Sequence, residues 1–458
     1  MSPACILFQG CVPHQVNSSP FPALDEASCI ASFSNDTLPA ESALPCPWWD
    51  SFHDEDLSCL VTTALEKNPD VRSISRRIEQ ANARIVQAGA SLFPLLDGES
   101  EAQRSWDVDG DYTDEASFGF NLNWEIDLWG RIRSGRKARI NEAEATVQDW
   151  MSARLILSAA VAETWFAIAE QRGQLALARE QIEVNQTLLD MTELRFGQGQ
   201  NTVVGVYQQQ AQLEAILALV PDIESRIEEL ELVLDALAGQ VPGKKNRKKE
   251  RSDSYALLSP PPIPDAGVPA DLLCRRPDLR AQRARIVALD YEVGEAVADR
   301  MPRFSIGGSI TAASAVPGIE SLVGDAIANA VGPIIDAGDR KAEVRFRRAR
   351  VKEEIDVYTA MFLDAAREVE TALIRERKIA ERIQLQKKQL ETTRKLLRES
   401  RNQYSQGATD YLPVLDAVAR LQSLERDFLF SQREMLSARV VLHRALGGPM
   451  PDSTVKPH

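Results

Sequence analysis

The feature that most constrains this chain is an internal repeat, in which two long segments match at a constant spacing. The segment NPDVRSISRRIEQANARIVQAGASLFP begins at residue 68, and RPDLRAQRARIVALDYEVGEAVADRMP begins at residue 276. The same spacing of 208 residues relates Gly199, in RFGQGQ, to Gly407, in QYSQG. A spacing this constant indicates an ancient tandem duplication of one unit of about 200 residues.

The duplication predicts how the 458 residues are organised. We expect the first repeat at 46–240 and the second at 269–449, joined by a linker at 241–268. An N-terminal segment, 1–45, and a tail, 450–458, complete the chain. Both repeats show one order of elements: a helix, a β-hairpin and a long helical hairpin.

The long helical hairpins are predicted from an uninterrupted heptad pattern. No proline occurs between Arg131 and Gly197. Apolar residues recur there every seven positions: Val161, Ile168, Leu175, Ile182, Leu189 and Phe196. The second repeat has Ile383, Leu390, Leu397 and Tyr404 at the equivalent places. Sustained heptads are typical of coiled-coil packing, so we expect helical hairpins at about 132–238 and about 340–446.

The β-hairpins are predicted from strict alternation. Every second residue from Phe118 to Leu128 is apolar, and the residues between them are small or polar. This pattern suits a membrane β-strand with one face toward lipid and the other toward water. We expect hairpins at about 95–128 and about 303–335, with the last strand at about 326–335.

Four strands per chain are too few to close a barrel, and open sheet edges are not tolerated in lipid. Closure therefore requires several copies of the chain. Two copies give eight strands, whose interior side chains fill, whereas three copies give twelve strands and a pore. The sequence thus predicts a mainly α-helical protein with a membrane β-barrel. We expect a homotrimer that combines a 12-stranded β-barrel with a long α-helical coiled-coil barrel.

Composition and motifs argue against several other functions. The net charge of −14 disfavours nucleic acid as a partner, because phosphate binding requires a basic face. The sequence has no P-loop, G-x-S-x-G, H-E-x-x-H or Rossmann fingerprint, so we expect no enzyme, catalytic residue, cofactor or metal site. Two classes remain: a trimeric channel, and a coiled-coil scaffold or periplasmic adaptor. The alternating strand favours the channel.

The N-terminus indicates one candidate modification. MSPACILFQGC is apolar and ends in Gly-Cys, as a lipoprotein signal does just before its lipidated cysteine. Cys11 is therefore a candidate for lipidation. The segment lacks a basic n-region and its apolar stretch is short, so either the true start lies upstream or this is not a signal.

Four motifs carry a resemblance to a known family: PWWDSFHDEDLSCLVTTAL at 47–65, WEIDLWGRIRS at 124–134, LLCRRPDLRA at 272–281 and YSQGATDYLPVLDA at 404–417. Together they resemble the outer-membrane factor (TolC-like) family, in particular the lipoprotein branch of RND-type multidrug efflux systems. The resemblance implies a trimeric barrel in the outer membrane of a Gram-negative bacterium, continued by a helical tunnel in the periplasm.

The resemblance also implies partners: a periplasmic membrane-fusion adaptor and an inner-membrane RND-type pump that supplies the energy. The implied function is a passive exit duct in a tripartite efflux system. An outer-membrane duct for type I protein secretion remains the alternative, because similar conduits serve both.

The resemblance places a gate at the helical tips, built around Tyr404, Asp410, Asp416 and Arg420. Gly199 and Gly407 mark the two tip turns, where a left-handed conformation favours glycine. The alternative is that Asp416 and Arg420 form only an exposed pair four residues apart on a helix.

Two segments depart from the family pattern. Gly205 stands where the family often has a polar gate-linking residue, so one gate contact is in doubt. The run KKNRKKER at 244–251 is unusually basic and is interpreted as a solvated linker rather than a docking site.

Overall fold

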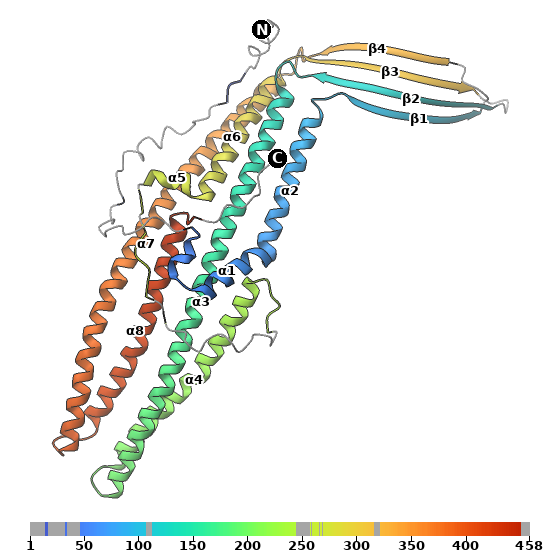
Figure 1. The fold of residues 1–458 in the computed structure, drawn as a ribbon. Coiled ribbons are helices and arrows are strands. Elements are labelled where there is room, and N and C mark those ends of the chain that lie inside the picture. Colours follow the sequence, from blue (N-terminus) through green and yellow to red (C-terminus); the bar gives the residue numbers. More distant parts are fainter. Residues whose placement is uncertain are drawn as a thin grey trace.

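The computed structural model describes residues 14–16, 33, 46–106, 112–243, 257, 259–264, 266–267, 269–315 and 321–449. The helices are η4 (Trp48–Phe52), α1 (Glu55–Lys67), α2 (Pro69–Ala90), α3 (Arg131–Gly197), α4 (Val203–Leu237), η5 (Pro269–Asp271), α5 (Leu272–Arg275), α6 (Pro277–Ala298), α7 (Asp339–Ser405) and α8 (Leu412–Ala445). The strands are β1 (Leu95–Trp106), β2 (Tyr112–Ile126), β3 (Arg303–Ala315) and β4 (Ser321–Val331). The sheet lies at one end of the helices and the tips of two long helical hairpins lie at the other (Figure 1).

The duplication is visible in the lengths of the helices. Helices α2 and α6 both have 22 residues and begin with proline, while α3 and α7 both have 67 residues. In each pair the second helix follows the first by 208 residues. At 1.5 Å per residue, α3 and α7 are each about 100 Å long. The structure therefore contains the two predicted helical hairpins, α3–α4 and α7–α8.

The junction between sheet and long helix depends on one carboxylate. Asp127 accepts hydrogen bonds from the backbone N–H groups of Ile132 (3.2 Å) and Arg133 (2.9 Å). Gly130, with φ of 75°, turns the chain into α3. The carboxylate satisfies two of the donors that a helix leaves unpaired at its N-terminus. The motif WEIDLWGR thus fixes where α3 begins.

The four strands form one antiparallel sheet in the order β1-β2-β3-β4. Phe118, Phe120 and Leu122 lie on one face of β2, and the register places Ile306 and Ile310 of β3 on the same face. The predicted alternation is therefore confirmed in β2 and β3. The last strand is earlier than predicted, because β4 occupies 321–331 rather than about 326–335.

The opposite face of the sheet is mostly polar and acidic. It carries Asp97, Glu99, Glu101, Glu115, Asn121, Asn123, Glu125 and Asp325, as the register of the strands shows. Strand β4 departs from the pattern, because Val323, Ile327 and Val331 lie on this polar face. The alternation signal was weak there, since small residues occupy the apolar face of β4.

The long helices form a single layer. Toward the tips, α3 contacts α4 on one side and α8 on the other, and α8 contacts α7. Toward the sheet, α3 contacts α2 and α6, and α6 contacts α7. The strand order β1-β2-β3-β4 thus continues as the helix order α2-α3-α6-α7 (Figure 1). Within the described chain, α2 and α4 border one edge of this layer and α7 borders the other.

A core at mid-height joins the two repeats. Trp48, Trp49 and Phe52 of η4 are buried against α1 and α3, and the Trp48 indole donates to Ser158 Oγ at 3.1 Å. The imidazole of His443 stacks on the Trp48 ring, with centroids 5.5 Å apart. The segment PWWDSF therefore secures α8 of the second repeat to the first repeat.

In the heptad stripe Val161, Ile168 and Leu189 are buried and Leu175 and Ile182 are half-buried, but Phe196 is 47% exposed. The predicted heptad packing therefore does not extend to this last position, where the Phe196 side chain is exposed. Buried polar residues accompany the stripe, and Gln174 donates to the Arg426 carbonyl of α8 at 2.9 Å. By length and composition, α3 is the one described helix that could cross a membrane, yet half of its apolar window is buried.

Candidate functional site at the helical tips

Both tips turn by the same backbone motif, in which glycine follows the last helical turn. The N–H of Gln200 donates to the Arg195 carbonyl, and the N–H of Ala408 donates to the Gln403 carbonyl, each at 2.9 Å. Gly199 and Gly407 have φ angles of 74° and 72°, which other residues rarely adopt. This Schellman geometry satisfies the last carbonyls of α3 and α7. The predicted tip turns lie at these two glycines.

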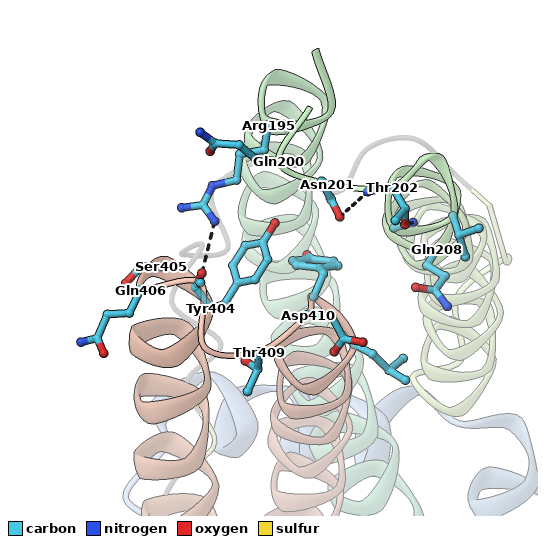
Figure 2. Close-up of a pocket in the computed structure, with 15 residues that line it drawn as sticks. Arg195, Gln200, Asn201, Thr202, Gln208, Tyr404, Ser405, Gln406, Thr409 and Asp410 are labelled. Atoms are coloured by element: carbon cyan, nitrogen blue, oxygen red, sulfur yellow. Dashed lines mark hydrogen bonds between the residues drawn. The ribbon is translucent and has the colours of Figure 1, made fainter. Parts of the chain in front are cut away.

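An aromatic and cationic cluster connects the two tips. The Arg195 guanidinium of α3 lies 4.5 Å from the centroid of the Tyr404 ring, and it donates to the Tyr404 carbonyl at 3.4 Å. Figure 2 shows Arg195 reaching toward Tyr404 at the end of α7. The Tyr404 ring meets the Tyr411 ring edge-on, with centroids 5.3 Å apart. These contacts hold the α7–α8 tip against α3.

A buried hydrogen-bond chain continues from this cluster into the stem. The Tyr411 hydroxyl donates to Gln209 Oε1 at 2.7 Å, and Gln209 Nε2 donates to the Asn185 carbonyl at 3.0 Å. Burial raises the pKa of Tyr411 to about 12, so its hydroxyl keeps its proton at physiological pH. The chain joins α8, α4 and α3. Buried polar networks of this kind specify one arrangement of helices.

An open groove of about 580 Å³ lies between the two tips. Residues from both tips line it: Arg195, Gln200, Asn201, Thr202, Val204, Gly205, Gln208, Tyr404, Ser405, Gln406, Gly407, Thr409, Asp410, Tyr411 and Leu412. Asp410 is exposed and is the one carboxylate among these lining residues. The lining is otherwise dominated by amides, hydroxyls and backbone groups, which suits a polar contact surface.

The predicted gate residues separate into two groups. Tyr404, Asp410 and Gly407 meet at the groove, whereas Asp416 and Arg420 do not line it. Asp416 and Arg420 form an ion pair of 3.7 Å four residues apart on α8, with side chains 66% and 70% exposed. Within one chain this geometry is that of an ordinary surface pair, which contributes about 0.3–0.5 kcal/mol. Any role of this pair in a gate depends on other copies.

Gly205 lies in the α3–α4 tip, closely surrounded by residues of that same tip. Thr202 caps α4 by accepting from the Gly205 N–H at 3.3 Å, and the Asn201 side chain covers the position. A Cβ at Gly205 would lie 2.9 Å from Asn201 Oδ1. A larger residue here would therefore displace Asn201.

Sequence reasoning missed Arg195, Tyr411, Gln209 and Asn185. Tyr411 follows Tyr404 by seven residues, a spacing that signals a shared cluster on either side of a turn. Gln209 and Asn185 gave no signal, because isolated amides on a polar helix resemble solvated residues.

Three further predictions fall outside these tips. Cys11 and the basic run 244–251 lie outside the described residues. Across the part of the chain that the structure describes, no group of three or more His, Cys, Asp or Glu residues could hold a metal ion.

The fold and the tips define a class of protein in which a membrane β-sheet is joined to a long stem of helical hairpins. The unit of β-hairpin and helical hairpin occurs twice within one chain. The chain belongs to the outer membrane efflux protein family, whose sequence model matches residues 60–240 and 268–448. The predicted family and its outer-membrane localisation in Gram-negative bacteria are thereby confirmed. Membership of a family of efflux proteins also favours the channel over the scaffold or adaptor.

Known proteins resemble the chain over nearly its whole length. It is 28% identical over 450 residues to the pyoverdine export outer membrane protein OpmQ of Pseudomonas putida, covering 94% of each chain. It is 25% identical to the cation efflux system protein CusC of Escherichia coli, covering 88% of each chain. The solved structure of the outer-membrane channel OprN superimposes with a TM-score of 0.82 at 26% identity, covering 92% of this chain and 96% of OprN.

Proposed function

We propose that the protein is the passive outer-membrane duct of a tripartite efflux system and that three copies form the duct. The sheet has four strands, and β1 and β4 each pair on one side only in the described chain. An edge without partners cannot face lipid, so β4 of one copy pairs with β1 of the next. Three copies give a 12-stranded barrel, and the helix layer continues below it as a 12-helix tunnel.

The orientation of the barrel wall follows from the two faces of the sheet. The face with Phe118, Phe120 and Leu122 meets lipid, and the face with Glu99, Glu101 and Asp325 lines the pore. A pore wall with this many carboxylates favours cations over anions.

The tips form the periplasmic end of the duct, where a membrane-fusion adaptor docks and connects it to an inner-membrane RND-type pump. The sequence carries no nucleotide-binding motif, so the pump supplies the energy. The polar groove between the two tips of each chain offers amide and hydroxyl partners to such an adaptor. The pump determines which compound is exported, and a type I secretion system is the alternative user of the same duct.

The same tips close the duct at rest. Three-fold symmetry brings three copies of Tyr404, Asp410, Asp416 and Arg420 toward the axis. Converging carboxylates repel unless they are paired or bind cations, so a ring of Asp416 is stable only beside Arg420. The Arg195–Tyr404 contact anchors each tip in the closed position.

Cys11 carries a lipid that assists anchoring in the outer membrane. The support is the Gly-Cys pair that follows an apolar stretch. Because the barrel is the main anchor, assembly does not depend on this lipid.

The observation that carries the proposal is the four-stranded sheet with one apolar face and two unpaired edges. The test is the mass of the protein extracted from outer membranes in detergent, measured by light scattering with the detergent subtracted. A mass of three chains of 50.7 kDa is expected. A monodisperse monomer would refute the trimer, and recovery in the soluble fraction would refute the membrane duct.

A further inference from the structure

A groove between α7 and α8 gathers cations on a chain that is acidic overall. It has a volume of about 600 Å³ and lies at the height where Glu376 of α7 pairs with Arg439 of α8. Its polar lining residues are Arg375, Lys378 and Arg382 of α7, with Arg433, Glu434 and Ser437 of α8. Four cations against one carboxylate reverse the sign of the chain's net charge of −14, so composition alone does not produce this lining.

Two of the four cations already meet carboxylates. Arg382 pairs with Glu434, which joins the two helices. Arg433 pairs at 3.3 Å with Glu170 of α3, whose side chain is 6% exposed. These pairs hold two guanidinium groups at the wall of the groove, and they balance only two of its positive charges.

The other two cations are available to a ligand. Lys378 pairs with Glu381 at 2.8 Å, but the two side chains are 60% and 54% exposed, and exposed pairs of this kind contribute little. Arg375 is exposed, and within the described residues no ion pair joins it to another side chain. A guanidinium and an ammonium group therefore line the groove with most of their charge unbalanced.

The base of the groove is apolar. Ala372 and Ile379 of α7 line it together with Ala438 and Val441 of α8. The two alanines are buried, and their small side chains leave space above them. The groove thus combines an apolar base with a cationic rim, which suits a ligand that has an apolar body and several anionic groups.

The groove opens on the face of the helix layer opposite to the linker. Arg439 marks the linker face of α8, because its guanidinium donates to two carbonyl groups of the linker. At about 100° of rotation per residue, Ser437 and Val441 each lie about 160° away from Arg439 around the helix. On α7, Lys378 lies at the same angle from Glu376, the partner of Arg439.

The linker face is the outer face of the proposed tunnel. Twelve helices packed about 10 Å apart form a ring with a radius of about 19 Å at the helix axes, which leaves an open width of about 28 Å. Trp48 stacks on His443, which follows Arg439 by one helical turn, so η4 covers the same face of the layer as the linker. Three copies of η4 and the linker would obstruct an opening of that width. They therefore lie outside, and the groove opens into the tunnel.

We propose that this groove binds organic anions in transit through the duct, and that its three copies form a basic belt inside the stem. The inference rests on the proposed function, because the belt forms only when three chains close the tunnel. The ligand class is a compact organic molecule that carries two or more carboxylate, phosphate or sulfonate groups. Arg375 offers such a group a planar, bidentate partner, whereas Lys378 adds a point charge on a flexible stem.

The belt acts independently of the acidic ends of the duct. About 54 Å of helix separate Arg375 from the start of α7 at Asp339, and about 45 Å separate it from the end at Ser405. Both distances far exceed the Debye length, which is about 8 Å at physiological ionic strength. The carboxylates of the barrel and the tips are therefore screened from the groove, and the belt retains anions that an acidic pore alone disfavours.

The test measures the binding of hydroxypyrene trisulfonate, a fluorescent trianion with an apolar ring, to the full-length trimer in detergent. Fluorescence anisotropy should show saturable binding that weakens as salt is added. Arg375→Gln with Lys378→Gln should raise the dissociation constant at least tenfold. Arg375→Lys with Lys378→Arg keeps both charges and should bind within threefold of the wild type.

The matched control is Lys387→Gln with Arg398→Gln. It removes one Lys and one Arg charge from exposed positions of the same helix. Because these positions follow Glu376 at spacings of eleven residues, they lie on the linker side of α7 and not at the groove. The control should leave the dissociation constant unchanged, and light scattering of every variant should give the mass of three chains.

Single-channel recording locates the bound trianion. Added to the barrel side of a planar bilayer, it should reduce the wild-type conductance, and channels with Arg375→Gln and Lys378→Gln should need at least tenfold more of it. Equal binding by the wild type and this double variant, or equal weakening by the control, would overturn the groove as the site. Binding without a reduced current would overturn its place inside the tunnel. These results would leave the duct standing, whereas a wild-type monomer that forms no channel would overturn the proposed function.

Discussion

Replacing Arg439 with methionine should loosen the mid-height region where the linker meets the helices. Arg439 of α8 and Glu376 of α7 form an ion pair in which both side chains are 3% exposed. The Arg439 guanidinium also donates to the carbonyl groups of Pro261 and Pro262. The pair therefore fastens the linker to both helices of the second hairpin.

The size of the effect follows from what the substitution leaves behind. Glu376 would remain buried as a charge without its partner, and removing one member of a buried ion pair typically costs about 3–5 kcal/mol. The two proline carbonyls would also lose their donor. The double variant Arg439→Met with Glu376→Met leaves no buried charge, so it should cost about 1 kcal/mol or less.

Hydrogen exchange of the trimer, followed by mass spectrometry of peptides from α8 near residues 435–443, reports the free energy of local opening without requiring reversible unfolding. A cost of about 3–5 kcal/mol makes exchange roughly two to four orders of magnitude faster. The reasoning is refuted if Arg439→Met accelerates exchange less than tenfold, or if the double variant exchanges as fast as the single variant.

Three further predictions concern the membrane, the core and the N-terminus. Leu122→Arg places a cation on the lipid face and should cost about 2–4 kcal/mol near the midplane, whereas Asn123→Arg on the pore face should be tolerated; equal loss of assembled trimer from outer membranes would contradict the assigned register. Burial, assisted by Arg439, lowers the pKa of His443 to about 3, so below the unfolded value of 6.5 only the unfolded chain takes up the proton. Stability should therefore fall by about 2 kcal/mol as the pH drops from 7.5 to 5, and His443→Gln should remove most of this dependence of the melting temperature. If Cys11 is lipidated, mass spectrometry of the mature N-terminus should show acyl chains, and Cys11→Ser should still assemble; an unmodified peptide spanning residues 5–17 from the mature protein would reject the assignment.

The regular parts of the fold could be predicted from the sequence because each has a strong period. The constant spacing of 208 residues and the absence of proline from Arg131 to Gly197 predicted helices whose observed ends differ by only one or two residues. The alternation from Phe118 predicted which residues of β2 share the apolar face, but β2 begins earlier, at Tyr112, and ends at Ile126. In β4 the signal failed, because apart from Leu322 the apolar face carries only alanine and glycine, which differ little in hydrophobicity from the residues between them.

The tips were only partly predictable, because their contacts join helices far apart in the sequence. Glycine commonly ends a helix at a turn, so Gly199 and Gly407 could be assigned to the tip turns from the sequence alone. The contact of Arg195 with Tyr404 depends instead on how two hairpins of equal length align their ends, and no local pattern encodes that alignment. The buried amides Gln209 and Asn185 look solvated in a sequence, since only the packed structure shows that they satisfy one another.

The central claim is that three copies form a cation-selective duct that is closed at its helical tips. Single-channel conductance in planar bilayers tests it most directly. Wild-type trimers should show a small, cation-selective conductance. Asp416→Ala should lower the selectivity, and Tyr404→Phe combined with Arg420→Ser should raise the conductance by loosening the closed tips. Trimers that form no channel would contradict the claim itself, and a conductance and selectivity unchanged by all three substitutions would place the constriction away from the tips.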